Sequence, residues 1–356
     1  MKSVTKNLLS ERFVRKLLHW NKSENTRLMP WKGEKDPYKI WLSEIILQQT
    51  RVQQGLKYYE SFIKAFPTIH HLASAPQQVV YKLWEGLGYY NRCNNLIKTA
   101  KFISNDLKGI FPSDYQSLIE LKGIGPYTAA AISSFAFNLP YAVLDGNVFR
   151  VLSRIFRIEI PMDSPEGKNF FSNLAQSILP PKKSAAYNQA IMDFGATICK
   201  VCPECALCFF KNDCLAFQYK QQLLLPVRQH RIIIKERWFH YIILQYRDKV
   251  ALQQRTMSDI WQNLYEVVLF EGFKRWKDQE VLLQLAKTYG IKEKDYDKLS
   301  VQDNKTQRLT HQLIHFSFIN LNLHKKLKVP GYTYVHKTEL DKYPFPKTLQ
   351  AYLSTL

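Results

Sequence analysis

Cysteines crowd into one short window of this chain. Five of the six lie between Cys199 and Cys214, in the segment GATICKVCPECALCFFKNDC, and only Cys93 lies elsewhere. Thiolate sulfur is a soft ligand that suits zinc and iron–sulfur clusters. Because the thiols are so close together and the rest of the chain offers almost none, we expect a metal or an iron–sulfur cluster, not a disulfide framework.

Two carboxylates elsewhere in the chain have sequence neighbours that are typical of acid–base groups. Glu44 lies in the segment WLSEIILQQTRV, where a helix would place Glu44, Gln48 and Arg51 on one face. A lone helical glutamate is usually solvated, but these neighbours are almost wholly apolar, which predicts a buried carboxyl with a raised pKa and general-acid chemistry near neutral pH. Asp145, in VLDGNVFR, precedes a predicted helix and is typical of an N-cap, although a capping carboxylate can also face a pocket.

A glycine-rich segment, LKGIGPYTA, joins two helical patterns at residues 121–129. Gly123 and Gly125 permit a tight turn and let a phosphate approach backbone N–H groups that the next helix polarises. A plain turn between packed helices is the alternative, but the full segment resembles a helix-hairpin-helix, which clamps DNA phosphates without reading sequence. Lys122 would contact a phosphate there or face solvent.

The elements that position these residues divide the chain into two parts. Residues 1–220 are predicted to be all-α, and residues 237–356 to be α+β, with 221–236 as a basic connector. The predicted helices start at Asp36-Pro37 and Ala75-Pro76 and cover 113–122 and 127–137. The predicted strands cover 238–246, 250–253, 267–270 and 316–323, with a helix at 279–289.

Charge and hydropathy narrow the class of protein. The formal net charge is +20 and the pI about 9.5, which favours a polyanionic partner, although basic proteins of several other classes share this property. No apolar run is long enough to span a membrane, and the N-terminus lacks the apolar core of a signal peptide. We therefore expect a protein of a reducing, bacterial-type cytoplasm that works on the nucleoid.

The order of these motifs resembles the endonuclease III superfamily of DNA base-excision glycosylases, and the segment around Glu44 resembles its MutY family of adenine glycosylases. The other matching segments are MPW (29–31), DPY (36–38), GLGYYNR (86–92), YNQAIMDFGA (187–196) and DIWQNLYE (259–266). The resemblance implies an all-α helix-hairpin-helix region with an iron–sulfur loop, followed by an α+β Nudix-like domain. It also implies a monomer that removes adenine opposite 8-oxoguanine or G from double-stranded DNA.

The resemblance assigns roles to the candidate catalytic residues. Glu44 would protonate adenine at N7 and later help to activate water, and Asp145 would stabilise the oxocarbenium-like sugar. Tyr127 and Asn147 would support these carboxylates. Family members that also cut the strand carry a lysine nucleophile at the position of Tyr127, and a tyrosine cannot form a Schiff base, so we expect a monofunctional hydrolase that leaves an abasic site.

The resemblance assigns DNA contacts to six further residues. They are Arg27 and Gln189 against the flipped adenine, Gln49 and Tyr89 as intercalating side chains, and Thr50 and Leu87 beside 8-oxoguanine. For Arg27 and Gln189, an ordinary position on a helix surface is the alternative. Core packing is the alternative for Leu87 and Tyr89, but the flanking glycines predict an exposed loop tip.

The second part departs from the family pattern in two places. The residues after Gly272 lack the glutamate-rich Nudix box, so nucleotide hydrolysis is not expected. The family reads 8-oxoguanine with a loop of the type F-S-H. The favoured alignment places His311, Ile314 and His315 there, which replaces the serine by a side chain without hydrogen-bonding groups. A shifted register through Thr310 and His311 restores a hydroxyl.

The cysteine spacing departs as well. The family holds a four-iron cluster with C-x6-C-x2-C-x5-C, whereas Cys199, Cys205, Cys208 and Cys214 shorten the first loop by one residue and leave Cys202 over. Cys202 could replace Cys199 as the first ligand, and zinc is the alternative to a [4Fe-4S] cluster.

Two other functions compete with adenine removal. One is an endonuclease III-type glycosylase and lyase acting on oxidised pyrimidines, against which Tyr127 and the extra domain argue. The other is a DNA-binding protein without catalysis, against which Glu44 and Asp145 argue.

Overall fold

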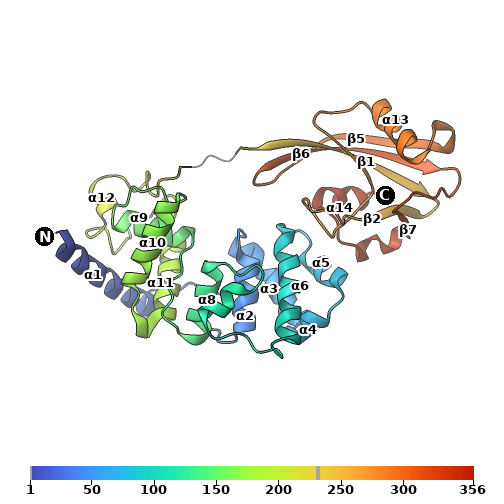
Figure 1. The fold of residues 1–356 in the computed structure, drawn as a ribbon. Coiled ribbons are helices and arrows are strands. Elements are labelled where there is room, and N and C mark those ends of the chain that lie inside the picture. The colour runs from blue at the N-terminus through green and yellow to red at the C-terminus, as the bar shows by residue number, and fades with distance from the viewer. Residues whose placement is uncertain (1, 230–232) are drawn as a thin grey trace. The chain divides into compact units, whose positions relative to one another are not determined.

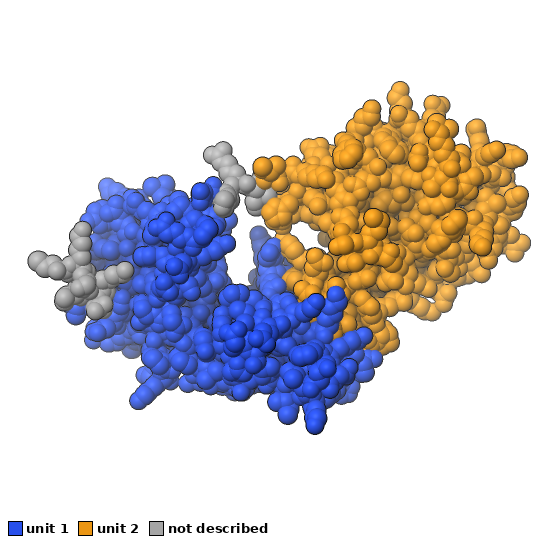
Figure 2. All heavy atoms as spheres, viewed as in Figure 1, with its two compact units in different colours: residues 1–74, 98–231 blue, residues 75–97, 232–356 orange. Residues whose placement is uncertain are grey.

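The computed structural model describes residues 2–229 and 233–356 (Figure 1). The chain forms two compact units, which Figure 2 colours separately: residues 1–74 with 98–231, and residues 75–97 with 232–356. The predicted division at 221–236 is therefore incomplete, because 75–97 lies within the predicted catalytic part yet belongs to the second unit. Part of the predicted connector, 230–232, falls outside the described residues.

The regular structure described in the first unit is helical, as the sequence predicts. Its helices are α1 (Lys2–Ser23), α2 (Pro37–Leu47), α3 (Val52–Ala65), α4 (Ile69–Ser74), α7 (Tyr115–Glu120), α8 (Pro126–Phe137), α9 (Gly146–Ile155), α10 (Pro165–Ile178), the short 3-10 helix η1 (Pro181–Lys183), α11 (Ser184–Thr197) and α12 (Leu215–Gln218). Helix α6 (Tyr90–Asn105) begins in the second unit and ends in the first.

Local capping explains where the central helix begins. The Asp36 carboxylate accepts a hydrogen bond from Tyr38 N at 2.9 Å, and Pro37 occupies the first helical position. Nearly every side chain of α2 is then buried, from Ile40 to Ile46, against neighbours that include α3 and α8. A helix that is apolar all round belongs in a core, and this one carries Glu44 into it.

The N-terminal helix α1 packs against the segment that carries the cysteines. Trp20 stacks on Phe209 at a centroid distance of 5.7 Å, and both lie over the core formed by α1, α9, α10 and α11. Asp213 pairs with Lys16 at 2.5 Å and with Arg12 at 2.9 Å. The cysteine loop is thus held by an aromatic layer and by two ion pairs.

The second unit is built on a mixed seven-stranded sheet. Its elements are α5 (Gln77–Trp84), β1 (Lys235–Tyr246), β2 (Lys249–Gln254), β3 (Tyr265–Glu266), β4 (Val268–Gly272), α13 (Asp278–Tyr289), η2 (Glu293–Asp295), β5 (Tyr296–Arg308), β6 (Gln312–Leu323), β7 (Thr333–His336), η3 (Lys337–Lys342) and α14 (Lys347–Leu353). The strand order is β3-β2-β1-β6-β5, with β4 also on β1 and β7 on β2. β1 and β6 are parallel, and the other pairs are antiparallel.

Helices cover both faces of this sheet. Val281 and Leu285 of α13 pack on one face, while Tyr352 of α14 stacks on Phe318 of the other at 4.3 Å. The predicted strands and the helix at 279–289 are all present, whereas β5, β7 and α14 were not predicted. Among the described residues, no helix is both long and apolar enough to cross a membrane.

Candidate active site

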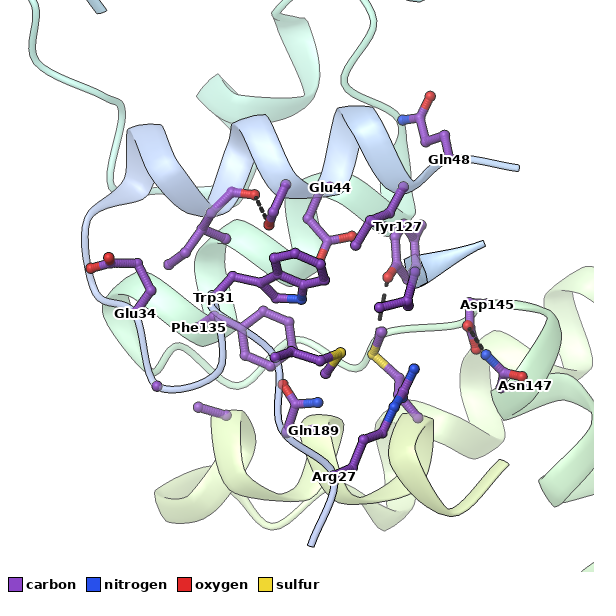
Figure 3. Close-up of a pocket in the computed structure, with 18 of the residues that line it drawn as sticks. Arg27, Trp31, Glu34, Glu44, Gln48, Tyr127, Phe135, Asp145, Asn147 and Gln189 are labelled. Atoms are coloured by element: carbon purple, nitrogen blue, oxygen red, sulfur yellow. Dashed lines mark hydrogen bonds between the residues drawn. The ribbon is translucent and has the colours of Figure 1, made fainter. Parts of the chain in front are cut away.

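A cavity of about 760 Å³ in the first unit collects most of the predicted catalytic and base-binding residues (Figure 3). Its size lies in the range of ordinary ligand pockets. The predicted residues that line it are Arg27, Glu44, Gln49, Thr50, Tyr127, Asp145, Asn147 and Gln189. They come from α2, α8, α9, α11 and the loops beside them, so only the tertiary fold brings them together.

Glu44 lies in the C-terminal half of α2, and 6% of its surface is exposed. Burial raises its pKa to about 7, a hydrogen bond with Tyr127 opposes that rise, and the nearby Asp145 adds to it. The predicted elevation is therefore present, and its cause is loss of water. The predicted helical face of Glu44, Gln48 and Arg51 is only partly right, because α2 ends at Leu47 and Arg51 is the N-cap of α3.

Asp145 combines the two roles that its sequence allowed. As the N-cap of α9, it accepts a hydrogen bond from Val148 N at 2.8 Å, and it also lines the cavity. Asn147 Nδ2 donates to its second oxygen at 2.7 Å, and Arg150 holds Asn147 Oδ1 at 2.8 Å. Burial raises the pKa of Asp145, and these hydrogen bonds oppose that rise.

Tyr127 stands beside Glu44 at the start of α8. Burial, followed by the charges of Glu44 and Asp145, raises the pKa of its hydroxyl well above the ordinary value, so the group stays protonated. A buried, neutral hydroxyl donates hydrogen bonds to a carboxylate but offers no amine for covalent chemistry.

The cavity wall that contains Arg27 and Gln189 is organised by Asp193, which the sequence analysis did not single out. Its side chain has no exposed surface and accepts hydrogen bonds from Arg27 Nη1 at 2.7 Å and Gln189 Nε2 at 3.0 Å. Asn25 Nδ2 donates to the other oxygen at 2.8 Å, and Lys32 Nζ lies 3.2 Å from it. Gln189 and Asp193 are one turn apart on α11, and this spacing was the available sequence signal.

Apolar side chains complete the walls. Trp31 and Phe135 lie across the cavity from α11, with Met29 and Met192 also lining it (Figure 3). The sequence analysis named Trp31 and Met29 only as parts of a matching segment. Flat aromatic and flexible thioether surfaces suit a planar, mostly apolar ring.

The predicted DNA-facing residues of the first unit lie at exposed turns. Gln49 is exposed with φ of 55° in the short link between α2 and α3, and Thr50 follows it half-buried. In the hairpin, Lys122 and Gly123 are exposed, and the φ of 81° at Gly123 explains why glycine stands there. Gly125 is exposed at the N-cap of α8, and a Cβ built on it would meet nothing within 4 Å, which leaves the helix N-terminus open to an anion.

In the second unit, the glycine loop after α5 only partly matches its prediction. Tyr89 is 45% exposed, with φ of 51°, and its hydroxyl lies 2.5 Å from Thr310 Oγ1. Leu87 is 5% exposed. The expectation of an exposed Leu87 is therefore wrong in this structure, and packing accounts for this side chain.

The favoured alignment of the 8-oxoguanine loop is also wrong. Ile314 has no exposed surface and points into the sheet from β6, so it cannot contact a base. His315, on the opposite face, stacks on Trp238 at 4.1 Å and lies 3.3 Å from a Glu236 carboxylate oxygen. The turn between β5 and β6 is residues 309–311, with an exposed His311, which is the shifted register.

Four cysteines surround one small cavity of the first unit. They are Cys199, Cys205, Cys208 and Cys214, whereas Cys202 is exposed and does not line it. Of the two candidates for first ligand, Cys199 is thus the one that faces the other three. The donor set fits a group bound by four thiolates, although among the described side chains no three potential ligands converge on a single-ion site. Burial raises the pKa of Cys208 to about 12, so a bound metal group would have to displace its proton.

Three carboxylates of the second unit pair with arginines. Arg237 pairs with Asp259 and Glu271, each at 2.6 Å, and Arg255 pairs with Glu266. These three carboxylates are therefore already neutralised by cations.

Comparisons with known proteins agree with this architecture. Residues 42–169 match the family described as HhH-GPD superfamily base excision DNA repair protein, and residues 240–355 match the NUDIX domain. The chain is 35% identical over 315 residues to the adenine DNA glycosylase of Buchnera aphidicola subsp. Baizongia pistaciae, covering 88% of this chain and 87% of that one. It is 37% identical over 216 residues to the adenine DNA glycosylase of Homo sapiens, covering 58% of this chain and 39% of that one.

Solved structures resemble the helical part. A thermostable thymine-DNA glycosylase superposes with a TM-score of 0.56 at 28% identity, covering 60% of this chain and 99% of that one. Endonuclease III in a non-covalent DNA complex gives a TM-score of 0.51 at 20% identity, covering 59% of this chain and 98% of that one, a level that shows a shared fold alone.

Proposed function

The chain belongs to the family of adenine DNA glycosylases, and we propose that it removes adenine opposite 8-oxoguanine or G from double-stranded DNA and leaves an abasic site. The observation that carries this proposal is that two carboxylates, the buried Glu44 and the half-buried Asp145, line one cavity, where burial raises the pKa of Glu44 to about 7. A carboxyl with such a pKa is part-protonated near neutrality and can donate a proton.

The chemistry separates into two proton movements. Glu44 donates its proton to N7 of the flipped adenine, the bond between C1′ and N9 breaks, and its electron pair leaves with the base. The sugar becomes oxocarbenium-like, and the carboxylate of Asp145 stabilises its positive charge. Water then attacks C1′ while the Glu44 carboxylate takes a proton from it, which regenerates the acid.

The neighbouring side chains hold these groups in place. Asn147 donates to Asp145, and the Tyr127 hydroxyl, which donates to Met192 Sδ at 4.0 Å, lowers the pKa of Glu44 against the effect of burial. Arg27 and Gln189, both fixed by Asp193, would bind the base edge. Because Tyr127 supplies no amine, the reaction stops at the abasic site.

We assign the contacts with the strand opposite adenine to turn residues of each unit by itself. In the first unit, Gln49 would fill the gap left by base flipping, whose cost is about a few kcal/mol, and the half-buried Thr50 would contact the 8-oxoguanine. In the second unit, the exposed Tyr89 would intercalate, and the half-buried Thr310 would contact the 8-oxoguanine through its hydroxyl. The hairpin of Lys122, Gly123 and Gly125 would hold a phosphate through backbone N–H groups.

We also propose that Cys199, Cys205, Cys208 and Cys214 hold one [4Fe-4S] cluster. When bound, the cluster ties the ends of the 199–214 loop together, and its chemistry is that of a structural crosslink. The side chains that face it, including Arg154, whose Nη1 lies 3.5 Å from Cys199 Sγ, belong to the first unit.

A single-turnover assay on three duplexes tests the proposed activity. They carry adenine opposite 8-oxoguanine, adenine opposite G, and thymine glycol opposite adenine. We expect adenine release from the first two and strand scission only after alkali. Cleavage of the thymine glycol duplex alone would establish the endonuclease III-type alternative, and binding without base release from any duplex would establish the non-catalytic one.

A further inference from the structure

One face of α5 contacts residues of the second unit, although α5 lies between helices of the first unit in the sequence. Gln78, Tyr81, Lys82 and Glu85 follow the i, i+3, i+4, i+7 pattern of a single helix face. All four lie in segment 75–97, which is part of the second unit. We call these four residues the α5 face.

The α5 face makes polar contacts with segments late in the sequence. Asn263 Nδ2 donates to the buried Tyr81 hydroxyl at 2.9 Å. Gln78 Nε2 donates to the Lys342 carbonyl at 2.8 Å. These contacts tie the helix to the segments before β3 and after β7.

The carboxylate of Glu85 contacts three partners at once. Its Oε1 accepts a hydrogen bond from Phe345 N at 2.8 Å, and its Oε2 accepts one from Gln350 Nε2 at 2.8 Å. Lys82 Nζ lies 2.7 Å from Oε2, and only 9% of the Glu85 side chain is exposed. A carboxylate that accepts from several donors out of water forms strong, directional bonds.

The position of Glu85 gives these bonds a consequence for DNA recognition. Glu85 is the C-cap of α5 and directly precedes the loop that carries Tyr89. That loop depends on positive φ angles of 87° at Gly86 and 79° at Gly88, and Trp84 Nε1 donates to the Gly88 carbonyl at 3.0 Å. Glycines adopt such angles without steric cost and leave the loop conformationally free, so a fixed end holds its tip in one place.

We propose that Glu85 is a positioning residue for recognition of the base opposite adenine: by binding Phe345 and Gln350, it holds the loop so that Tyr89 stays beside Thr310 on the second unit. The inference rests on the proposed function. Glu85 touches neither the DNA nor the reacting atoms, and it acts through Tyr89.

The first test compares lesion preference in single-turnover assays. We expect Glu85→Ala to reduce the ratio of rates on adenine:8-oxoguanine and adenine:G duplexes by about tenfold, the size expected from losing a buried charge-assisted contact. The rate on adenine:G should fall less than the rate on adenine:8-oxoguanine, because Tyr89 serves base flipping in both duplexes, whereas Thr310, which the loop holds beside Tyr89, contacts 8-oxoguanine alone. Glu85→Gln, which keeps one acceptor, should give a smaller loss. Glu60→Ala, at an exposed position of α3, is the control and should keep the full ratio.

A second variant tests the same contact from the other side. Gln350→Leu removes the donor to Oε2 and leaves Glu85 in place, so it should lower the ratio in the same direction even if Glu85→Ala folds poorly. Combining it with Glu85→Ala should add little, because residues in one network are not additive. An unchanged ratio in Glu85→Ala, or an equal loss of rate on both duplexes, would overturn the proposal.

Hydrogen exchange tests the anchoring without any enzymatic activity. In Glu85→Ala we expect faster exchange in peptides covering residues 86–92 and 345–350, and no change in peptides from α2. Unchanged exchange at 86–92 would show that Glu85 does not hold the loop. If the native protein releases no adenine from any duplex, the proposed function fails, whereas this experiment still decides whether Glu85 is an anchor.

Discussion

Asp193 and Arg27 form an ion pair of 2.7 Å in which the carboxylate has no exposed surface. Arg27 lines the cavity, so a buried residue of α11 fixes the direction of a cation on the cavity wall. Lys32 lies on the other oxygen at 3.2 Å, which leaves two cations dependent on one carboxylate.

Asp193→Asn should therefore impair both folding stability and adenine release. Removing one charge from a buried pair leaves its partners uncompensated and costs about 3 kcal/mol of the free energy of unfolding. We expect the single-turnover rate to fall by at least about tenfold, because Arg27 loses its orientation. Asp259→Asn is the control outside the cavity: it likewise removes a carboxylate that pairs with two cations, here Arg237 and Arg255, although 32% of this side chain is exposed, and it should be destabilised less but keep its rate. Equal loss of rate in both variants would contradict a positioning role for Asp193.

The rate of base release should follow the protonation of Glu44. Because burial raises the pKa of this carboxyl to about 7, the acid is present below that pH and is lost above it. We expect the single-turnover rate constant to decline as pH rises through about 7, and Glu44→Gln to be inactive at every pH. Glu34→Gln is a control in the same cavity, since the pKa of Glu34 is lowered by hydrogen bonding and it should keep the native profile. A profile that is flat through neutrality would exclude Glu44 as the general acid.

The same carboxyl should make stability depend on pH. Its pKa rises from an ordinary 4.5 to about 7 on folding, so the folded state binds the proton more tightly, and the stabilisation is complete below 4.5 and lost as pH rises through about 7. The pKa change corresponds to about 3 kcal/mol.

Glu44→Gln cannot ionise, so it should unfold at higher urea concentration than the native protein at about pH 8 and at a similar concentration at about pH 5. Glu60→Gln, on the exposed surface of α3, should match the native protein at both. A Glu44→Gln variant that is less stable than the native protein at the higher pH would mean that the carboxylate is well solvated.

Substitutions at Thr310 and at Ile314 should have different effects on the preference for 8-oxoguanine over G. Thr310→Val removes the hydroxyl beside Tyr89 and should lower the preference for 8-oxoguanine over G opposite adenine in a competition between the two duplexes. Ile314→Ser places a hydroxyl in the core, so it should lower the unfolding midpoint and leave that preference unchanged. The reverse pattern would restore the register that the structure rejects.

The cysteine ligands can be tested by iron content and visible absorbance of protein purified without oxygen. Cys199→Ala should lose both, because Cys199 lines the cavity with the other three thiols, whereas Cys202→Ala should keep both. Loss of iron and absorbance in Cys202→Ala alone would mean that Cys202, and not Cys199, is the first ligand. Colourless native protein that contains zinc would replace the cluster by zinc.

Local chemistry explains which parts of the structure were predictable. The start of α2 follows from Asp36 and Pro37, and the burial of Glu44 follows from its apolar neighbours, since both depend on residues close in sequence. The hairpin and the capping role of Asp145 are equally local.

Long-range partners decided the features that the sequence analysis missed. Asp193 gains its role from Arg27 and Lys32, which lie far from it in the chain. The burial of Leu87 depends on how its loop folds back. β5 was missed because its residues are mostly polar, as suits an edge strand, and without β5 the turn at 309–311 had no partner to fix the register of Ile314.

The membership of residues 75–97 in the second unit has a consequence for how such chains can be recombined. An exchange between two relatives with a single crossover near residue 230 would join the α5 face of one parent to the Asn263, Phe345 and Gln350 positions of the other. Substitutions on either side would then meet unmatched partners. A viable chimera has to take residues 75–97 and the C-terminal part from the same parent. Two separate stretches of the gene therefore have to be exchanged together.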